Sequence, residues 1–295
     1  MPETVTLLID PVPADADAGD LSGTFRTVDA TEPALRVGEL STQRGDGIFE
    51  TIGLVDGHAQ EVGPHLERLR NSARICELPE PNRPQWEAAI ARAVAELPAT
   101  GEFAIKLVLS RGIEHGPTPT AWLHAVPAKD STPAREGGIR VVTLDRGYDR
   151  GAAERAPWLL LGAKTLSYAV NMAALREAAR RGADDAIFLS SDGYVMEGPT
   201  SSVILRFGDA YATPAATGAI LAGTTQQSLF EHLRASGARV EERDIVADEL
   251  READAAWLVS SVRLAAGLRE LDGAPFPFDA EATRAFNAYL LSPRD

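Results

Sequence analysis

A single lysine at the end of an apolar run is the residue of this sequence best suited to chemistry. Lys164 follows the apolar run 156–163 and precedes a helix-like segment. The other two lysines are Lys106 and Lys129, so most of the 29 basic side chains are arginines. A desolvated lysine can lose its proton and attack a carbonyl, which an arginine cannot do. The alternative interpretation is a strand-end lysine that reaches solvent.

Three further features carry groups that could complete a site. Glu197 ends a strand-like segment beside a Gly-Pro turn. Thr224 and Thr225 open a helix-like segment, where backbone N–H groups and the helix dipole favour an anion. A threonine at that place can also simply cap the helix. Arg68 lies beside the apolar stripe of a predicted helix, where it is either solvated or turned inward toward an anion.

One cofactor, pyridoxal phosphate, needs all of these groups at once. Its aldehyde needs a lysine amine, and its pyridine nitrogen needs a carboxylate that keeps the ring an electron sink. Its phosphate needs helix N–H groups and a guanidinium. Each feature alone is common in purely structural roles. Their combination predicts a pyridoxal phosphate site in which Lys164 is catalytic.

The elements that must position these groups alternate between strands and helices, which predicts an α/β (α+β) fold. Residues 127–138 contain two prolines and two glycines and few large apolar side chains. We therefore expect a small domain over 1–127, a linker over 128–138 and a large domain over 139–295. Strands are predicted at 4–9, 25–28, 103–110, 121–126, 139–144, 186–190, 194–196, 202–206, 210–212, 240–245 and 256–261. Helices are predicted at 64–78, 84–97, 168–181, 224–235, 247–253 and 279–291.

Composition excludes several classes of protein. The net charge of −14 argues against a protein that binds a nucleic-acid backbone. The N-terminus lacks a basic region followed by a long apolar one, so we expect no signal peptide, and no apolar run is long enough to span a membrane. The single cysteine, Cys76, fits a reducing compartment and predicts a cytoplasmic protein. The five histidines lack metal-ligand spacing, so no metal is expected.

Seven short segments carry a further signal through their order in the chain. They are Gly-Asp-Gly-Ile-Phe-Glu-Thr (45–51), His-Leu-Glu-Arg-Leu (65–69), Ala-Lys-Thr-Leu-Ser-Tyr (163–168), Gly-Tyr-Val-Met-Glu-Gly (193–198), Thr-Pro (213–214), Gly-Thr-Thr (223–225) and Val-Ser-Ser-Val (259–262). In this order they resemble the fold-type IV family of pyridoxal-phosphate enzymes, also called aminotransferase class IV. The family contains branched-chain aminotransferases, D-amino-acid aminotransferases and 4-amino-4-deoxychorismate lyases. The resemblance implies a small N-terminal α/β domain, a larger C-terminal, mixed, β-barrel-like domain with helices, a homodimer and a cofactor between the domains.

The resemblance implies a role for each matching residue. Lys164 matches the lysine that carries the cofactor and moves the α-proton, and Lys106 becomes an ordinary strand residue. Glu197 matches the carboxylate on the pyridine nitrogen, and Tyr168 resembles the tyrosine near the phenolic oxygen. The remaining cofactor-binding candidates contact the phosphate or the ring: Arg68, Thr200, Ser201, Leu221, Thr224, Thr225 and Ser261.

The resemblance is closest to the aminodeoxychorismate lyase branch, which releases pyruvate and 4-aminobenzoate for folate biosynthesis. The segments 45–51 and 107–112 look most like that branch. Branched-chain enzymes usually have an arginine where this chain has Gly53, but lyases often have one there too. Lyases also have an asparagine where this chain has Ser167. A transaminase of branched-chain or D-amino acids therefore remains the alternative. Phe49, Arg44 and Arg111 are candidates for substrate binding, although either arginine could equally be a plain surface residue.

Overall fold

The computed structural model describes residues 3–16 and 19–295 and divides the chain into two compact units. Unit 1 contains residues 1–128, 163–168 and 293–295, and unit 2 contains residues 129–162 and 169–292. The segment 163–168, with Lys164, thus belongs to the same unit as the N-terminal strands, although it follows them by more than thirty residues of unit 2. This return of the chain is not apparent from the order of the predicted elements.

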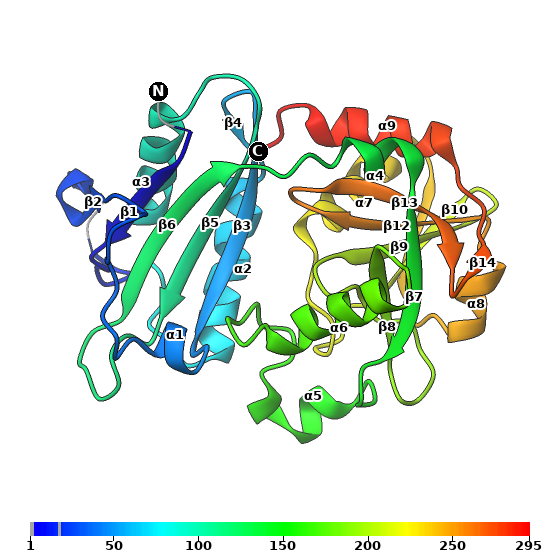
Figure 1. Ribbon diagram of the computed structural model, residues 1–295, viewed down its shortest axis with the longest axis horizontal. Coiled ribbons are helices and arrows are strands. Elements are labelled where there is room, and N and C mark those ends of the chain that lie inside the picture. Colours follow the sequence, from blue (N-terminus) through cyan, green and yellow to red (C-terminus); the bar gives the residue numbers. More distant parts are fainter. Residues whose placement is uncertain (1–2, 17–18) are drawn as a thin grey trace. The chain divides into compact units, whose positions relative to one another are not determined.

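Unit 1 is built on a six-stranded sheet with the order β2-β1-β6-β5-β3-β4, in which all neighbours are antiparallel (Figure 1). β3 pairs with β5 over its whole length and is buried on both faces. The strands are β1 (Val5–Ile9), β2 (Phe25–Thr27), β3 (Gly47–Val55), β4 (His58–Ala59), β5 (Glu102–Ser110) and β6 (Thr120–Pro127).

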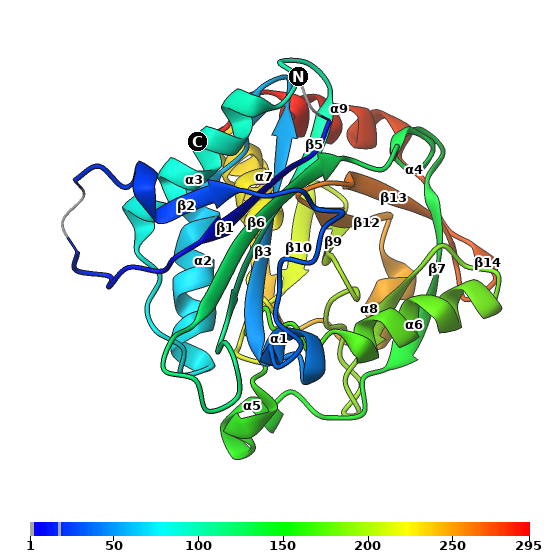
Figure 2. The same ribbon diagram turned by 60° about the vertical axis from the view of Figure 1, so that its left-hand side comes forward.

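Two long helices pack against this sheet, α2 on β3 and α3 on β1 and β6 (Figure 2). The predicted apolar stripe of α2 is confirmed, because Leu66, Leu69, Ala73 and Cys76 are all buried. Asn82 caps α3 by accepting a hydrogen bond from the backbone N–H of Gln85. The helical segments of unit 1 are η1 (Ser22–Thr24), α1 (Leu40–Gln43), α2 (Val62–Ile75) and α3 (Arg83–Glu96).

Unit 2 contains a mixed sheet with the order β11-β10-β9-β12-β13-β7-β8, and β14 pairs with β13 at its side (Figure 1). The pairs β10–β11, β13–β7 and β7–β8 are parallel, and the others are antiparallel. The strands are β7 (Ile139–Asp145), β8 (Asp185–Leu189), β9 (Ser202–Phe207), β10 (Ala210–Pro214), β11 (Arg239–Arg243), β12 (Ala255–Ser260), β13 (Leu264–Leu271) and β14 (Ala274–Pro275).

One hydrophobic cluster of unit 2 forms where α7 packs against β12 and α9 against β13. Trp257 is fully buried there and donates a hydrogen bond to Thr283 of α9. Phe230 of α7 and Phe286 of α9 complete the cluster. The helical segments of unit 2 are α4 (Thr132–Gly137), α5 (Ala152–Arg155), η2 (Pro157–Leu159), α6 (Ala169–Arg180), α7 (Thr224–Ala235), α8 (Ala247–Glu252) and α9 (Ala280–Leu291). The mixed α/β fold class is thereby confirmed.

Two predicted segments differ from the structure. The expected strand 194–196 forms only isolated bridges, Leu189 with Val195 and Tyr194 with Val246, because the chain turns at Gly198 instead of continuing a ladder. Within the expected linker, residues 132–137 form α4, whose Arg135 is buried. Pro133 lies in the first turn of this short helix, and Gly138 is its C-cap.

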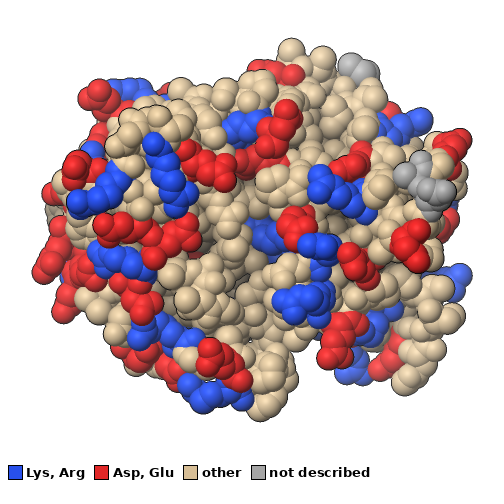
Figure 3. All heavy atoms as spheres, turned by 180° about the vertical axis from the view of Figure 1, so that it is seen from behind, with Lys and Arg blue, Asp and Glu red and all other residues tan. Residues whose placement is uncertain are grey.

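The surface carries acidic and basic side chains side by side. On the face shown in Figure 3, Lys and Arg alternate with Asp and Glu. Many of them form ion pairs within one helix, such as Arg83 with Glu87 and Arg92 with Glu96. Within residues 3–16 and 19–295, no helix has both the length and the apolar character needed to cross a membrane.

Candidate active site

In unit 1, the backbone around Lys164 is held along the edge of β3. The carbonyl of Lys164 accepts a hydrogen bond from the N–H of Phe49 at 2.9 Å, and the N–H of Leu166 donates to the carbonyl of Gly47 at 2.8 Å. The N–H of Lys164 donates to Oγ of Ser72, which is fully buried on α2. A strand edge and a helix side chain therefore fix the position from which the lysine side chain extends.

Two glycines of the Gly-Asp-Gly segment make this approach possible. A Cβ at Gly47 would lie 2.8 Å from the carbonyl oxygen of Leu109 and 2.8 Å from a methyl carbon of Leu166. Gly45 has a φ of +67°, and a Cβ there would lie 3.1 Å from the backbone of Ser167. Gly45 is therefore required by close packing against the segment 163–168, and Gly47 by close packing against both Leu166 of that segment and the backbone of β5.

The side chain of Lys164 lies against aromatic rings. Its Nζ is 4.4 Å from the centre of the Phe49 ring and 5.7 Å from that of Tyr168. These two rings meet edge to face at 5.2 Å. The Nζ of Lys106 lies 4.9 Å from the same Phe49 ring. An amine in contact with aromatic faces loses part of its hydration, which suits a lysine that must act as a nucleophile.

Arg68 is held by a carboxylate that the sequence did not single out. Its Nε and Nη2 each donate to Glu50 at 2.7 Å, and Nδ1 of His65 lies 2.7 Å from the same carboxylate. Burial alone would raise the pKa of the Glu50 carboxyl, but Arg68 and then His65 outweigh it and hold that pKa far below its ordinary range. Burial lowers the pKa of His65, which is therefore neutral.

The two arginines predicted to bind substrate, Arg111 and Arg44, are more exposed than Arg68. Arg111 donates to Asp46 and to the carbonyl oxygens of Cys76 and Glu77, and so joins two loops of unit 1. Arg44 pairs with Glu114 at the surface. The structure thus gives both arginines partners within unit 1, and their role toward a substrate stays a prediction.

In unit 2, Glu197 sits at the end of an irregular strand beside β8. Its carbonyl accepts from the N–H of Phe188 at 2.8 Å, which fixes its backbone. Its Oε2 accepts from the backbone N–H of Leu221 at 3.1 Å. The N–H favours the charged form of the carboxylate, which is the form that can hold a proton on a pyridine nitrogen.

The turn after Glu197 is fixed by a polar network that the sequence analysis missed. Asn171 of α6 donates to the carbonyl of Pro199 at 2.6 Å and accepts from Arg146 at 3.3 Å. Arg146 also donates to the hydroxyl of Tyr148 at 3.1 Å. Burial raises the pKa of Tyr148, and nearby Glu197 acts in the same direction. No local motif marks these residues, because they come from three separate segments.

Two predicted polar residues follow in this turn. Ser201 is buried, and its hydroxyl has no hydrogen-bond partner among the described residues. A Cβ at Gly198 would lie 2.4 Å from that hydroxyl, so only glycine fits beside it. Thr200 is exposed. A buried hydroxyl without a partner is costly unless a bound group supplies one, and this supports a polar ligand beside Glu197.

The start of α7 gathers three predicted hydroxyls. Oγ1 of Thr225 lies 3.2 Å from Oγ of Ser261, and Oγ1 of Thr224 lies 3.5 Å from it. The N-cap residue is Gly223, and no side chain caps the helix. The threonines therefore do not act as plain caps. The hydroxyls and the N–H groups of the first helical turn together provide the donors that a phosphate needs.

Arg135 holds the loop that carries Ser261 in place through hydrogen bonds to its backbone. Its guanidinium donates to the carbonyl oxygens of Val262 and Arg263, each at 2.9 Å. Arg263 in turn pairs with the buried Asp185 at 2.6 Å. The only signal in the sequence was an arginine inside an apparent linker, which was insufficient to find this contact.

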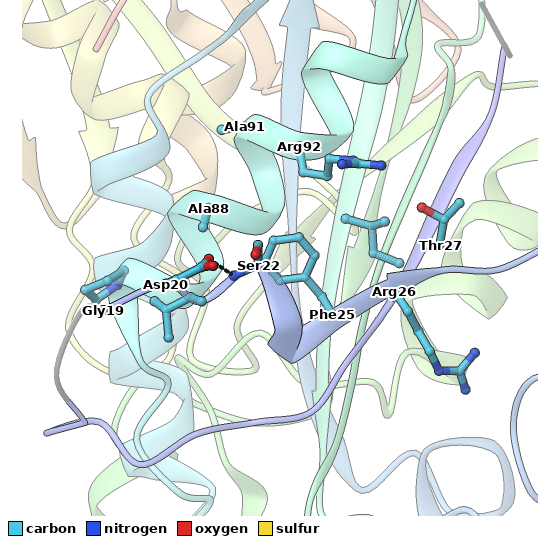
Figure 4. Close-up of a pocket in the computed structure, with 12 residues that line it drawn as sticks. Gly19, Asp20, Ser22, Phe25, Arg26, Thr27, Ala88, Ala91 and Arg92 are labelled. Carbon is cyan, nitrogen blue, oxygen red and sulfur yellow. Dashed lines mark hydrogen bonds between the residues drawn. The ribbon is translucent and has the colours of Figure 1, made fainter.

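A hollow of about 720 Å³ in unit 1 contains none of the predicted residues (Figure 4). It lies between the loop 19–27 and α3, with Phe25 and Ala88 among its apolar lining. Asp20 in its wall accepts from the N–H of Ser22 within its own loop. We assign no chemistry to it. Within the described parts of the chain, no group of three or more His, Cys, Asp or Glu residues could hold a metal ion.

Comparison with known proteins identifies the family to which this arrangement belongs. The family model described as amino-transferase class IV matches residues 47–282. The chain therefore belongs to this family, and it is a pyridoxal-phosphate-dependent enzyme of fold type IV. The resemblance seen in the sequence is thereby confirmed. The amine, the carboxylate, the clustered hydroxyls and the unpartnered Ser201 are chemically suited to that cofactor.

Similar proteins include both lyases and transaminases. A protein of Mycobacterium tuberculosis named bifunctional aminodeoxychorismate lyase / D-amino acid transaminase is 45% identical over 83% of this chain and 88% of its own length. A fold IV transaminase from Curtobacterium pusillum has a TM-score of 0.93 with 48% identity, covering 98% of this chain and 99% of that one. A hypothetical aminotransferase from Mycobacterium tuberculosis in a pyridoxal-phosphate-bound form has a TM-score of 0.87 with 40% identity, covering 97% of each chain.

Replacing Gly47 by alanine tests the close approach of the lysine segment to β3. We expect Gly47→Ala to lower the free energy of unfolding by about 1–3 kcal/mol, because backbone atoms would have to move. It should also weaken cofactor binding by displacing Lys164. Gly137→Ala is the control, since nothing lies within 4 Å of a Cβ there. Urea unfolding and cofactor titration measure both effects. Equal stability and affinity of the two variants would contradict the argument.

Proposed function

We propose that Lys164 carries the aldehyde of pyridoxal phosphate, and that Glu197 holds the proton on its pyridine nitrogen. Arg68, the N-terminus of α7 and the hydroxyls of Thr224, Thr225 and Ser261 bind the phosphate. Tyr168, Thr200, Ser201 and Leu221 contact the rest of the cofactor. The observation that carries this proposal is the position of the Lys164 amine against Phe49, with its backbone fixed on both sides.

In the proposed reaction, Lys164 moves a proton and Glu197 holds one on the cofactor. When bound, the cofactor supplies an electron sink for bonds at the carbon that bears the substrate's amine. The amine of Lys164 takes the proton from that carbon and returns it, and the fixed backbone keeps its reach constant. The Leu221 N–H orients the Glu197 carboxylate, which would hold the proton on the pyridine nitrogen of the bound cofactor.

We propose aminodeoxychorismate lyase as the activity, which converts 4-amino-4-deoxychorismate into 4-aminobenzoate and pyruvate. The formation of an aromatic ring drives the loss of pyruvate. The segments 45–51 and 107–112 favour the lyase, and the similar protein from Mycobacterium tuberculosis is named for both activities. Because that name includes D-amino acid transaminase, transfer of the amino group of a D-amino acid is the second candidate. Both reactions begin with removal of a proton, so Lys164 serves either.

The attachment of the cofactor can be tested directly. We expect Lys164→Ala to lose the absorbance of the covalently attached cofactor and all activity, because no other lysine takes its place. Lys129→Ala, which changes an exposed lysine, should keep both. Reduction with borohydride followed by peptide mass spectrometry should find the label on the peptide that contains Lys164. A label on Lys106 in the wild type would overturn the assignment.

A paired assay separates the two candidate activities. Purified enzyme is given 4-amino-4-deoxychorismate in one reaction, and D-alanine with a keto-acid acceptor in the other. We expect release of 4-aminobenzoate with an equal amount of pyruvate. Rapid formation of pyruvate from D-alanine without any 4-aminobenzoate in the first reaction would establish the transaminase instead.

We propose further that the protein is a homodimer of the cytoplasm. The exposed apolar side chains of unit 2 support the dimer, with Trp158 exposed to 75% and Val170 to 60%. The single cysteine, Cys76, supports a reducing compartment. Burial raises the pKa of its thiol to about 11, so it stays an unreactive thiol.

Sedimentation tests the proposed homodimer. The wild type should sediment as a dimer at micromolar concentration, and Trp158→Ser should shift the equilibrium toward the monomer, because a large apolar side chain would be lost from the interface. Replacing an exposed side chain of α3, as in Arg92→Ser, is the control. A wild type that sediments as a monomer, or a Trp158→Ser variant as tightly dimeric as the control, would contradict the proposal.

A further inference from the structure

A fully buried carboxylate lies behind the arginine to which the proposed function assigns the phosphate. Glu50 and His65 have no exposed surface, and the side chain of Arg68 is 12% exposed. Glu50 accepts from Nε and Nη2 of Arg68, one bond to each of its oxygens, both at 2.7 Å. This two-point contact fixes the plane of the guanidinium as well as its position.

The second partner of Glu50 fixes the carboxylate itself. Nδ1 of His65 lies 2.7 Å from Oε2 of Glu50. Because the carboxylate is charged and can only accept, Nδ1 must carry the hydrogen of the neutral imidazole. His65 and Arg68 are three residues apart on α2, so they share one face of the helix, and Glu50 reaches that face from β3. Glu50, His65 and Arg68 form a trio whose side chains have little freedom to move, because β3 and α2 hold them from two sides.

The N–H donors of Arg68 lie along two edges of its guanidinium, and Glu50 binds one of these edges. A guanidinium has five N–H groups in a rigid plane, and Glu50 takes two of them. The other three point away from Glu50, in directions set by that pair. An arginine whose plane is already fixed loses less entropy when it binds a phosphate than an arginine on a mobile side chain.

We infer that Glu50 is a positioning residue, supported by His65, that fixes the guanidinium of Arg68 for the cofactor's phosphate. This inference rests on the proposed role of Arg68. Glu50 acts on the cofactor only through Arg68, so its effect should depend on both the phosphate and the arginine. A residue with a purely structural role would affect cofactors with and without a phosphate alike.

The same helix provides a matched control. Glu67 pairs with Arg70 at 2.5 Å, with side chains exposed to 58% and 55%. Such a pair gains little, because water screens it. Glu67→Gln therefore makes the same chemical change one residue away from Arg68, without touching the trio.

The experiment compares the affinities of the apoenzyme for pyridoxal phosphate and for pyridoxal, which lacks the phosphate. We expect Glu50→Gln to weaken binding of pyridoxal phosphate on the order of tenfold, as the loss of a hydrogen bond to a charged group does. Binding of pyridoxal should not change, and Glu67→Gln should change neither. In an Arg68→Gln background, Glu50→Gln should have no further effect on pyridoxal phosphate.

Several results would overturn the inference. If Glu50 only neutralised Arg68, Glu50→Gln would tighten phosphate binding. An equal loss for both ligands, or a loss that persists in the Arg68→Gln background, would show a structural role. Circular dichroism checks that the variants fold. If the Glu50→Gln variant does not fold, Glu50→Asp replaces it, because it keeps the charge but moves the carboxylate away from Arg68. The same selective loss of affinity for pyridoxal phosphate is then expected. A wild type that binds neither ligand would instead refute the proposed function.

Discussion

The hydrogen bonds between the segment 163–168 and the start of β3 are the constraint on which the lysine side of the site depends. They bring a piece of chain from late in the sequence against the first long strand of unit 1. Close contact is possible only because Gly45 and Gly47 present no side chain. With the backbone of the segment fixed in this way, the amine of Lys164 lies against the ring of Phe49.

Two glutamates near the predicted site, Glu50 and Glu197, are held by different kinds of partner. Glu50 is fully buried and stays charged because two basic partners on α2 surround it. Removal of Arg68 would be costly, since the buried charge of Glu50 would remain uncompensated. Glu197 is only half-buried and is held through a backbone N–H. The first arrangement is suited to rigidity, and the second leaves a carboxylate oxygen able to bind another group.

Much of the fold and several site residues follow from local patterns. Period-two and period-3.6 patterns predicted most strands and helices, because side chains on one face of each element are buried together. Lys164, Glu197 and the Gly-Thr-Thr segment were predicted as site residues from chemistry and order, and their roles stay predictions. The segment 194–196 was misjudged as a strand because its composition suits one, whereas it forms only isolated bridges before the chain turns at Gly198. Arg135 was hidden inside an apparent linker.

The sequence by itself determined the kinds of chemical group present, their order and the family to which they belong, since these depend on residue type and spacing. Only the tertiary structure decided which groups meet. It joined Arg68 to Glu50 across a helix and a strand, and gave Gly47 its packing role. It also buried the hydroxyl of Ser201 with no hydrogen-bond partner among the residues that the structure describes. The physical reason is that these contacts join residues far apart in sequence, and their energies depend on burial and distance, which no local pattern records.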